Sequence, residues 1–364
     1  MSTAGFRRFP AAVLAEQARA LLSGWGFPPE MVAAAADALV DADLMGIDSH
    51  GTALLPIYRQ FLDDGRFNKA AAPRVERETP ASALLDGDGA LGQWPATLAT
   101  DLAVAKARQT GLAAVAVHGS NHFGAAGFYA RRAAEQGFVA LVASNVFSPA
   151  IVPTGGRIAR FGTNPLAFAA PAGRHRPFLF DMATSTVALG RVKKAAWRGE
   201  RVPFGWVLGP DGQPTDDPDL GWSTRLATPL GGTPELSSHK GTGLAAMVEI
   251  LGGVLARATL APLRQAPSEG RRPGGIGHFF LLLDPGLFGP PETFRDLLDE
   301  MIDALRATPP IDPAQPVLVA GDPEYAARDE RERAGVPLPN ALVDALRGLA
   351  EEAGVPFLLE EGKQ

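Results

Sequence analysis

Apolar residues recur at helical spacing along the first part of the chain. The series with this spacing cover residues 14–22, 32–40 and 53–63. A period near 3.6 residues is typical of helices that bury one face. The pattern therefore predicts three helices, and we expect residues 1–75 to form a helical cap.

The middle of the chain alternates short apolar runs with helical patterns. The predicted elements are strands at 82–86, 113–118 and 139–144 and helices at 96–109 and 126–136. After Asn145 the helical patterns become sparse, and residues 158–170 and 178–182 resemble strands joined by Pro/Gly turns. Such turns favour an antiparallel or mixed sheet over a doubly wound one. We expect residues 76–284 to form a sheet-containing α/β (α+β) domain for cofactor and substrate.

The pattern changes again toward the end of the chain. Residues 198–234 are rich in Gly, Pro and Asp, which predicts a long surface excursion. Residues 243–256 carry one apolar stripe, typical of an amphipathic helix, and Gly252-Gly253 within it indicate close packing against a neighbour. A buried strand is expected at 277–284, with helices at 292–307 and 339–353. We expect residues 285–364 to be a helical segment that packs with the cap.

Composition narrows the class of partner. The chain has 364 residues, 46% of them hydrophobic, and a formal net charge of −6 from 34 basic and 40 acidic residues. No long run of one sign occurs, which argues against nucleic-acid and membrane partners and favours a small-molecule substrate. The absence of cysteine excludes disulfides and thiolate metal sites and fits a reducing compartment, so we expect a cytoplasmic protein.

A glycine pattern, G-x-G-x-x-G, occupies residues 87–92 between a predicted strand and a predicted helix. A dinucleotide-binding fingerprint needs an acidic residue about 20 positions further on to hold the ribose. Residues 106–119 contain no acid. The glycines are therefore expected to form a turn.

Two histidine clusters carry candidate chemistry. In Asp48-Ser49-His50-Gly51 a histidine stands beside a glycine that lets a ligand approach, which suits a proton donor to a carbonyl or imine. Alternatively the Asp and Ser cap a helix, and the histidine is only exposed.

The second cluster, residues 118–124, follows a strand and precedes a helix, where sites of α/β proteins usually lie. Its histidines, His118 and His122, have the i, i+4 spacing of a zinc pair. The intervening Gly-Ser-Asn is a poor helix, however, and no nearby acid completes a ligand set, so no metal is expected.

Two further positions suit a cofactor or a substrate. Asp181 ends an apolar strand and precedes hydroxyl residues, so it could orient an amide, a ribose hydroxyl or an iminium, or could cap a helix near Val187. His239 and Lys240 open the amphipathic helix. The positive charge of a lysine is unfavourable beside the positive N-terminal end of a helix dipole. A phosphate or carboxylate bound between the lysine and the helix end would explain its presence, although the lysine could simply be solvated.

Taken in this order, the segments resemble the malate/L-lactate dehydrogenase-like family, which includes ureidoglycolate, sulfolactate and diketogulonate dehydrogenases and piperideine/pyrroline-2-carboxylate reductases. The similarity runs nearly end to end. It is carried by residues 48–51, 121–124, 162–168, 181–185, 212–218, 240–244, 277–280 and 321–324. The resemblance implies a non-Rossmann NAD(P)-binding fold with a largely antiparallel central sheet, a flanking helical domain from both chain ends, and a homodimer.

The resemblance also implies roles for single residues. His50 and His122 would donate or accept the proton, and Asp181 would lie beside the substrate and the nicotinamide. The substrate contacts would be Ser49, His50, Thr163 and Asn164. The cofactor contacts would be His122, Ser148, Phe178, Leu179, Phe180, Asp181, Met182, Ala183, Thr184, His239, Lys240, Gly321, Asp322 and Pro323. The choice between NAD and NADP stays open.

One departure from the family pattern concerns the substrate. Many members carry an arginine that holds the substrate carboxylate at the position where this chain has Leu54. Another arginine, such as Arg59 or Arg191, would have to replace it, or the substrate is atypical.

The sequence thus predicts hydride transfer from a nicotinamide to a small 2-oxo acid, with His50 or His122 supplying the proton. The closest alternative is a cyclic ketimine reductase, because an imine accepts hydride in the same way once it is protonated. A non-catalytic cofactor-binding protein and a zinc hydrolase are more remote alternatives.

Overall fold

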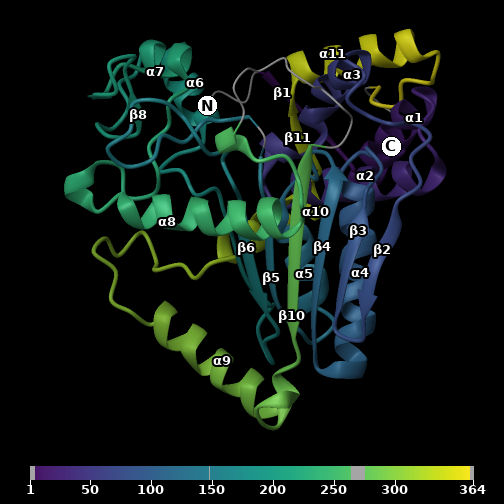
Figure 1. Cartoon of the computed structure of the whole chain (residues 1–364). Helices are drawn as coiled ribbons and strands as arrows, with labels where there is room; N and C mark the ends of the chain where they lie inside the picture. Colours follow the sequence, from purple (N-terminus) through teal and green to yellow (C-terminus); the bar gives the residue numbers. More distant parts are fainter. Residues whose placement is uncertain (1–4, 147, 264–274, 361–364) are drawn as a thin grey trace.

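The computed structural model describes residues 5–146, 148–263 and 275–360 of the chain. Seven of the strands in these residues form one sheet in the order β2-β3-β4-β10-β5-β6-β7 (Figure 1). Its strands are β2 (Arg74–Thr79), β3 (Ser82–Asp86), β4 (Leu112–Ser120), β5 (Val139–Ser144), β6 (Leu166–Ala170), β7 (Phe178–Met182) and β10 (Ile276–Leu283). Every neighbouring pair is antiparallel except β3 and β4. The predicted largely antiparallel sheet of an α/β protein is confirmed.

Helices cover both faces of this sheet, as Figure 1 shows. Along β10, Phe280 and Leu282 pack into a core with α4 (Gln93–Thr110) and α5 (Ala126–Ala134), whereas Phe279 packs on the other face. That other face is covered by α8 (His239–Val248) and the π-helical segment Glu249–Leu255 that continues it. Alternating side chains thus bury both faces of the sheet.

A separate core joins the two ends of the chain. Strands β1 (Phe6–Phe9) and β11 (Val336–Pro339) pair antiparallel. Around them lie α1 (Ala11–Gly24), α2 (Pro29–Leu44), α3 (Leu55–Asp63) and α11 (Asn340–Ala353). Their apolar stripes meet in one cluster that includes Leu21, Leu39 and Leu346. The chain ends therefore form one helical layer beside the sheet.

The remaining elements flank these cores, and Tyr325 of α10 packs against the core under α4 and α5. They are α6 (Leu189–Arg198), the pair β8 (Val207–Leu208) and β9 (Pro214–Thr215), α7 (Pro218–Thr224), α9 (Pro291–Arg306) and α10 (Asp322–Ala334). Helix α9 is held by Asp299, which accepts backbone hydrogen bonds from Gly173 and Arg174. No helix in the described part of the chain is long and apolar enough to cross a membrane. The division of the chain at residues 75 and 284 stays a prediction.

Most elements predicted from periodicity are confirmed, and two segments differ. Residues 158–170 were expected to be one strand, but only the Leu166–Ala170 part is extended. Gly162 packs directly against the Val146 backbone, and Asn164 has a φ of 39°, so the chain turns before the strand begins. Residues 198–234 were expected to form a surface excursion and no core element, but they contain β8, β9 and α7 and bury Val202 and Val207 in a small core.

The glycine pattern at 87–92 forms a turn, as predicted. The backbone N–H groups of Gly87 and Gly89 donate to the carbonyls of His118 and Gly119. A Cβ at Gly92 would lie 2.1 Å from the Asn121 carbonyl oxygen. These glycines therefore let the turn pack against the loop that carries His122.

Close packing under the π-helical segment explains Gly252 and Gly277. A Cβ at Gly277 would lie 2.0 Å from the Gly252 carbonyl oxygen, and a Cβ at Gly252 would lie 2.8 Å from the Asn145 nitrogen. Backbone therefore touches backbone where β10 passes beneath the segment. The predicted close packing of Gly252-Gly253 is confirmed.

This contact predicts an effect on stability. Gly277→Ala should lower the free energy of unfolding by about 1–3 kcal/mol. The new Cβ would collide with the Gly252 carbonyl oxygen, and this backbone group cannot rotate away as a flexible side chain can. The control is Gly348→Ala in α11, where nothing lies within 4 Å of the new Cβ. That variant should be more stable by about 0.5–1 kcal/mol, since alanine favours a helix. Urea unfolding of both variants measures the difference, and equal midpoints would contradict the packing argument.

Candidate functional site

A cavity of about 410 Å³ lies where several segments meet at one edge of the sheet. Its walls come from the end of α2 and the turn after it, the loops that follow β4 and β5, the start of α5, and the end of β7. His50, His122 and Asp181 all line it. The structure thus brings the three predicted catalytic residues together.

His50 ends the first of two 3₁₀ turns, Asp48–His50 and Thr52–Leu54, which join α2 to α3. The hydroxyl of Ser49 lies 2.9 Å from His50 Nδ1. Burial lowers the pKa of His50 below its ordinary value of 6.5. The ring is therefore mostly neutral at neutral pH but partly open to the cavity.

His122 is held by a chain of hydrogen bonds that starts on α4 and passes through α3. Gln93 Nε2 donates to the Tyr58 hydroxyl over 2.7 Å, and that hydroxyl lies 2.9 Å from His122 Nδ1. The Gly124 N–H also points at Nδ1, at 3.4 Å. In this arrangement Nδ1 accepts, so the proton of the ring is on Nε2. The imidazole therefore presents an N–H donor away from Tyr58.

The two histidines lie face to face. Their ring centroids are 5.6 Å apart with an interplanar angle of 26°. Burial, together with the nearby His50, lowers the pKa of His122 to about 3. Of the two rings, His50 is thus the one that exchanges a proton more readily near neutral pH.

Asp181 comes from β7 and reaches the start of α5. Its Oδ2 accepts the Gly127 N–H over 2.7 Å. Burial raises the pKa of Asp181 to about 6, and the charge of Glu324 adds to that rise. Asp181 does not cap the helix that follows β7, since α6 begins after Ala188 without a side-chain cap. The carboxylate instead places a negative charge on the cavity wall.

Other predicted site residues fall into two groups. Ser49, Thr163, Leu179, Met182 and Ala183 line the same cavity. Thr184 and Asn164 lie behind its wall. Thr184 donates to the Thr163 carbonyl, while Asn164 is fully buried, accepts the Val146 N–H and donates to Glu249. These two residues support the wall and do not face the cavity.

The remaining predicted cofactor contacts are not among the residues that line the cavity. Ser148 is exposed, and Phe178 and Phe180 lie on β7, the last strand of the sheet. His239 and Lys240 are exposed at the start of α8. The turn of Gly321, Asp322 and Pro323 begins α10 and packs against Leu179. A ligand that touches all of them would extend well beyond the cavity.

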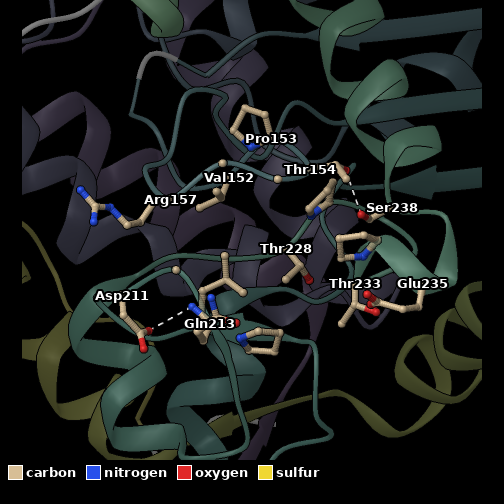
Figure 2. A pocket seen from close by; sticks show the side chains of 18 residues that line it. Val152, Pro153, Thr154, Arg157, Asp211, Gln213, Thr228, Thr233, Glu235 and Ser238 are labelled. Carbon is tan, nitrogen blue, oxygen red and sulfur yellow. Dashed lines mark hydrogen bonds between the residues drawn. The ribbon is translucent and has the colours of Figure 1, made fainter.

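A second hollow, of about 320 Å³, lies beside the start of α8 (Figure 2). Hydroxyl side chains and backbone form much of its lining. The hydroxyls of Thr154 and Ser238 are 2.8 Å apart, and Arg157 and Asp211 stand at the opposite side of the view from Glu235. Ser238 directly precedes His239, so this hollow adjoins the predicted cofactor contacts on α8.

Neither arginine suggested as a replacement at position 54 lines the cavity. Arg59 pairs with Asp63 and Glu352, and Arg191 lies over the Trp206 ring. Arg131 on α5 does line it, held by Asp41 and Glu135. Among the described residues, the arginine that lines this cavity is therefore Arg131, and how the substrate carboxylate is bound stays a prediction.

The sequence did not indicate Tyr58, Gln93 or Arg131 as site residues. Tyr58 and its partner His122 are 64 positions apart. Tyr58 and Arg131 also fit the buried faces of their helices, so each resembles an ordinary core position. His118 Nε2 lies 3.1 Å from Glu76, and no group of three or more His, Asp or Glu side chains in the described residues could hold a metal ion.

Comparisons with known proteins agree with this architecture. The family model described as "Malate/L-lactate dehydrogenase" matches residues 9–347. The malate dehydrogenase of Pyrococcus abyssi is 36% identical over 93% of this chain and 92% of its own length. A (2R)-3-sulfolactate dehydrogenase (NADP(+)) of Chromohalobacter salexigens is 35% identical over 91% of this chain and 94% of its own.

The fold agrees as well. The solved structure of malate dehydrogenase from Pyrococcus horikoshii OT3 superposes with a TM-score of 0.86 at 34% identity, covering 96% of this chain and 97% of that one. Fold, cavity and sequence define an oxidoreductase of the dehydrogenase class. The chain belongs to the malate/L-lactate dehydrogenase family.

The Tyr58 contact yields a prediction for His122. Histidine ¹⁵N spectra should show His122 as the neutral Nε2–H tautomer from about pH 5 to pH 8, because its pKa lies far below that range. Tyr58→Phe should lower turnover about tenfold by releasing the ring. Phe61→Leu, on the same helix, is the control and should leave turnover unchanged. A His122 that titrates near 6.5 would contradict this account.

Proposed function

We propose that this chain is a 2-hydroxy-acid dehydrogenase, which transfers hydride between NAD or NADP and a small 2-oxo acid. The observation that carries the proposal is the cavity in which His50, His122 and Asp181 meet. Membership of the malate/L-lactate dehydrogenase family supports it. The preference between NAD and NADP stays open.

The cavity residues fit a nicotinamide together with a small acid. The bound cofactor would supply the hydride. Leu179 and Met182 offer apolar surface for a planar ring, and the Asp181 carboxylate offers a negative charge beside it. A volume of about 410 Å³ is within the range of small-molecule sites.

The two histidines take different parts in the reaction. His122 donates its Nε2–H to the carbonyl oxygen of the substrate and stays neutral, since its pKa is too low for it to hold a second proton. His50, once it has taken up a proton from solvent, gives that proton to the same oxygen during reduction and is left neutral, and the neutral ring takes the proton back during oxidation. Ser49, at His50 Nδ1, orients the ring.

Arg131 is the group proposed to attract the substrate carboxylate. Its side chain lines the cavity beside Asp41. The two terminal nitrogens pair with Glu135 and Asp41, and each of them carries a second N–H. Asp41 also pairs with Arg328, which neutralises part of its charge. A carboxylate near the guanidinium would therefore find unused donor capacity.

Several broader expectations belong to the same proposal. The fold is a non-Rossmann NAD(P)-binding fold, supported by the antiparallel sheet and by the turn formed at residues 87–92. The protein is a homodimer, supported by exposed apolar side chains on α9, Leu297, Met301 and Leu305. It works in the cytoplasm, which the absence of cysteine favours.

The function is tested by following NADH and NADPH absorbance with pyruvate, oxaloacetate, phenylpyruvate and cyclic imines. Consumption with 2-oxo acids is expected, and His50→Ala should lower turnover about 10²- to 10⁴-fold while cofactor binding persists. His118→Ala is the control, because His118 lies outside the cavity. Consumption only with imines would indicate a ketimine reductase. Cofactor binding without any turnover would indicate a non-catalytic protein.

The role of Arg131 gives a separate prediction. Arg131→Met should raise KM for the 2-oxo acid about 10- to 100-fold, because a hydrogen bond to a charged group is lost, with a smaller effect on kcat. Arg59→Met, whose side chain pairs with Asp63 and Glu352 away from the cavity, should leave KM unchanged. An unchanged KM in Arg131→Met would remove this residue from substrate binding.

A further inference from the structure

Asp43 is a buried carboxylate that the proposed reaction does not use. It lies in the last turn of α2, is 1% exposed, and is not among the residues that line the cavity. A buried charge is costly unless other groups hold it. The groups that donate hydrogen bonds to the Asp43 carboxylate therefore indicate which segment it stabilises.

Both oxygens of Asp43 are directed at the segment that follows His50. Oδ2 accepts two hydrogen bonds from Thr52, from the backbone N–H at 2.9 Å and from the hydroxyl at 2.7 Å. A Cβ at Gly51 would lie 1.7 Å from Oδ1, so only glycine leaves room for the carboxylate. The carboxylate thus fixes the two residues directly after His50.

The segment before His50 is fixed to the same place. Arg331, from α10, donates to the backbone carbonyl of Asp43 and to the carboxylate of Asp48. Asp48 precedes His50 by two positions, and Thr52 follows it by two. His50 therefore stands in the middle of a short arch whose two ends are tied to the end of α2.

We propose that Asp43 is a positioning residue of this enzyme, which sets the direction of the His50 ring in the cavity by holding Thr52. The inference rests on the proposed function of His50. It adds a residue that acts through Thr52 and touches neither substrate nor cofactor. A displacement of about 1 Å of a reacting group can cost about 10²-fold in rate, so an arch held at both ends has a direct effect on turnover.

The electrostatics of Asp43 are consistent with this role. Burial raises the pKa of Asp43 to about 7, while the two Thr52 hydrogen bonds oppose the rise. The charged groups that face it are Asp48, which raises its pKa, and Arg331, which lowers it. Removal of the Thr52 hydroxyl should therefore raise the pKa of Asp43 further. A shift of the pH profile is the readout, because a loss of packing alone would not change this pKa.

The experiment compares Thr52→Val, Thr52→Ser and a control, Thr100→Val. Thr100 is a buried threonine on α4 whose hydroxyl donates to the Ala96 carbonyl, far from His50 in the chain. Thr52→Val should lower kcat with a 2-oxo acid about tenfold and move the pH profile of kcat upward. Thr52→Ser, which keeps the hydroxyl, should restore both. Thr100→Val should match the change in thermal midpoint of Thr52→Val but keep the wild-type kcat.

A second measurement separates this inference from the proposed function. The ¹⁵N and ¹H signals of His50, assigned with a His50→Asn variant, should shift in Thr52→Val and in Asp43→Asn and stay unchanged in Thr100→Val. If the wild type turns over no 2-oxo acid, the proposed function fails, and these shifts still decide whether Asp43 holds His50. Unchanged His50 signals, or a wild-type kcat and pH profile in Thr52→Val, would overturn the inference.

Discussion

The site depends on the pairing of β10 between β4 and β5. The residues of β10 lie more than 130 positions after those of β5, with which His278 pairs at Ser144. Both neighbours run antiparallel to β10, so β4 and β5 point the same way and their carboxyl ends reach one edge of the sheet. The His122 loop leaves β4 there and the Asn145 loop leaves β5. Because β6 and β7 continue antiparallel, Thr163 before β6 and Asp181 near the end of β7 arrive at the same edge.

The helical layer, together with α4 and α10, supplies the other half of the site. These elements fix which nitrogen of His122 carries the proton and how the His50 segment is held. Tyr58 and Gln93 hold His122 in one tautomer, and Asp43 and Arg331 tie down the arch that carries His50. Burial lowers the pKa of both histidines, so both rings are mostly neutral at neutral pH and His50 is the one that is protonated more readily. Burial raises the pKa of Asp181 to about 6, so its carboxylate still carries most of its negative charge at neutral pH. The cavity thus combines two neutral imidazoles with the charged side chains of Arg131 and Asp181.

Periodicity predicted the elements whose apolar residues lie on one face. Helices α1 and α2, strand β5 and strand β7 were therefore found within a few residues of their bounds. It missed α10, whose sequence is nearly all polar, and β2, which is exposed along its length, because neither has an apolar stripe to detect. The local motifs indicated His50, His122 and Asp181. Tyr58, Arg131 and Asp43 could not be found in the same way. Tyr58 contacts a histidine 64 positions away, and Arg131 and Asp43 occupy buried positions on helices, where the sequence pattern is that of an ordinary core residue.

The most direct test of the account is a crystal structure of the protein with NADH or NADPH and oxamate, an unreactive analogue of a 2-oxo acid. The account predicts oxamate in the cavity, within hydrogen-bond distance of His50 and His122, and the nicotinamide ring beside Asp181. Oxamate bound elsewhere, for example in the hollow beside the start of α8, or a nicotinamide ring far from these histidines, would contradict the assignment of this cavity as the active site.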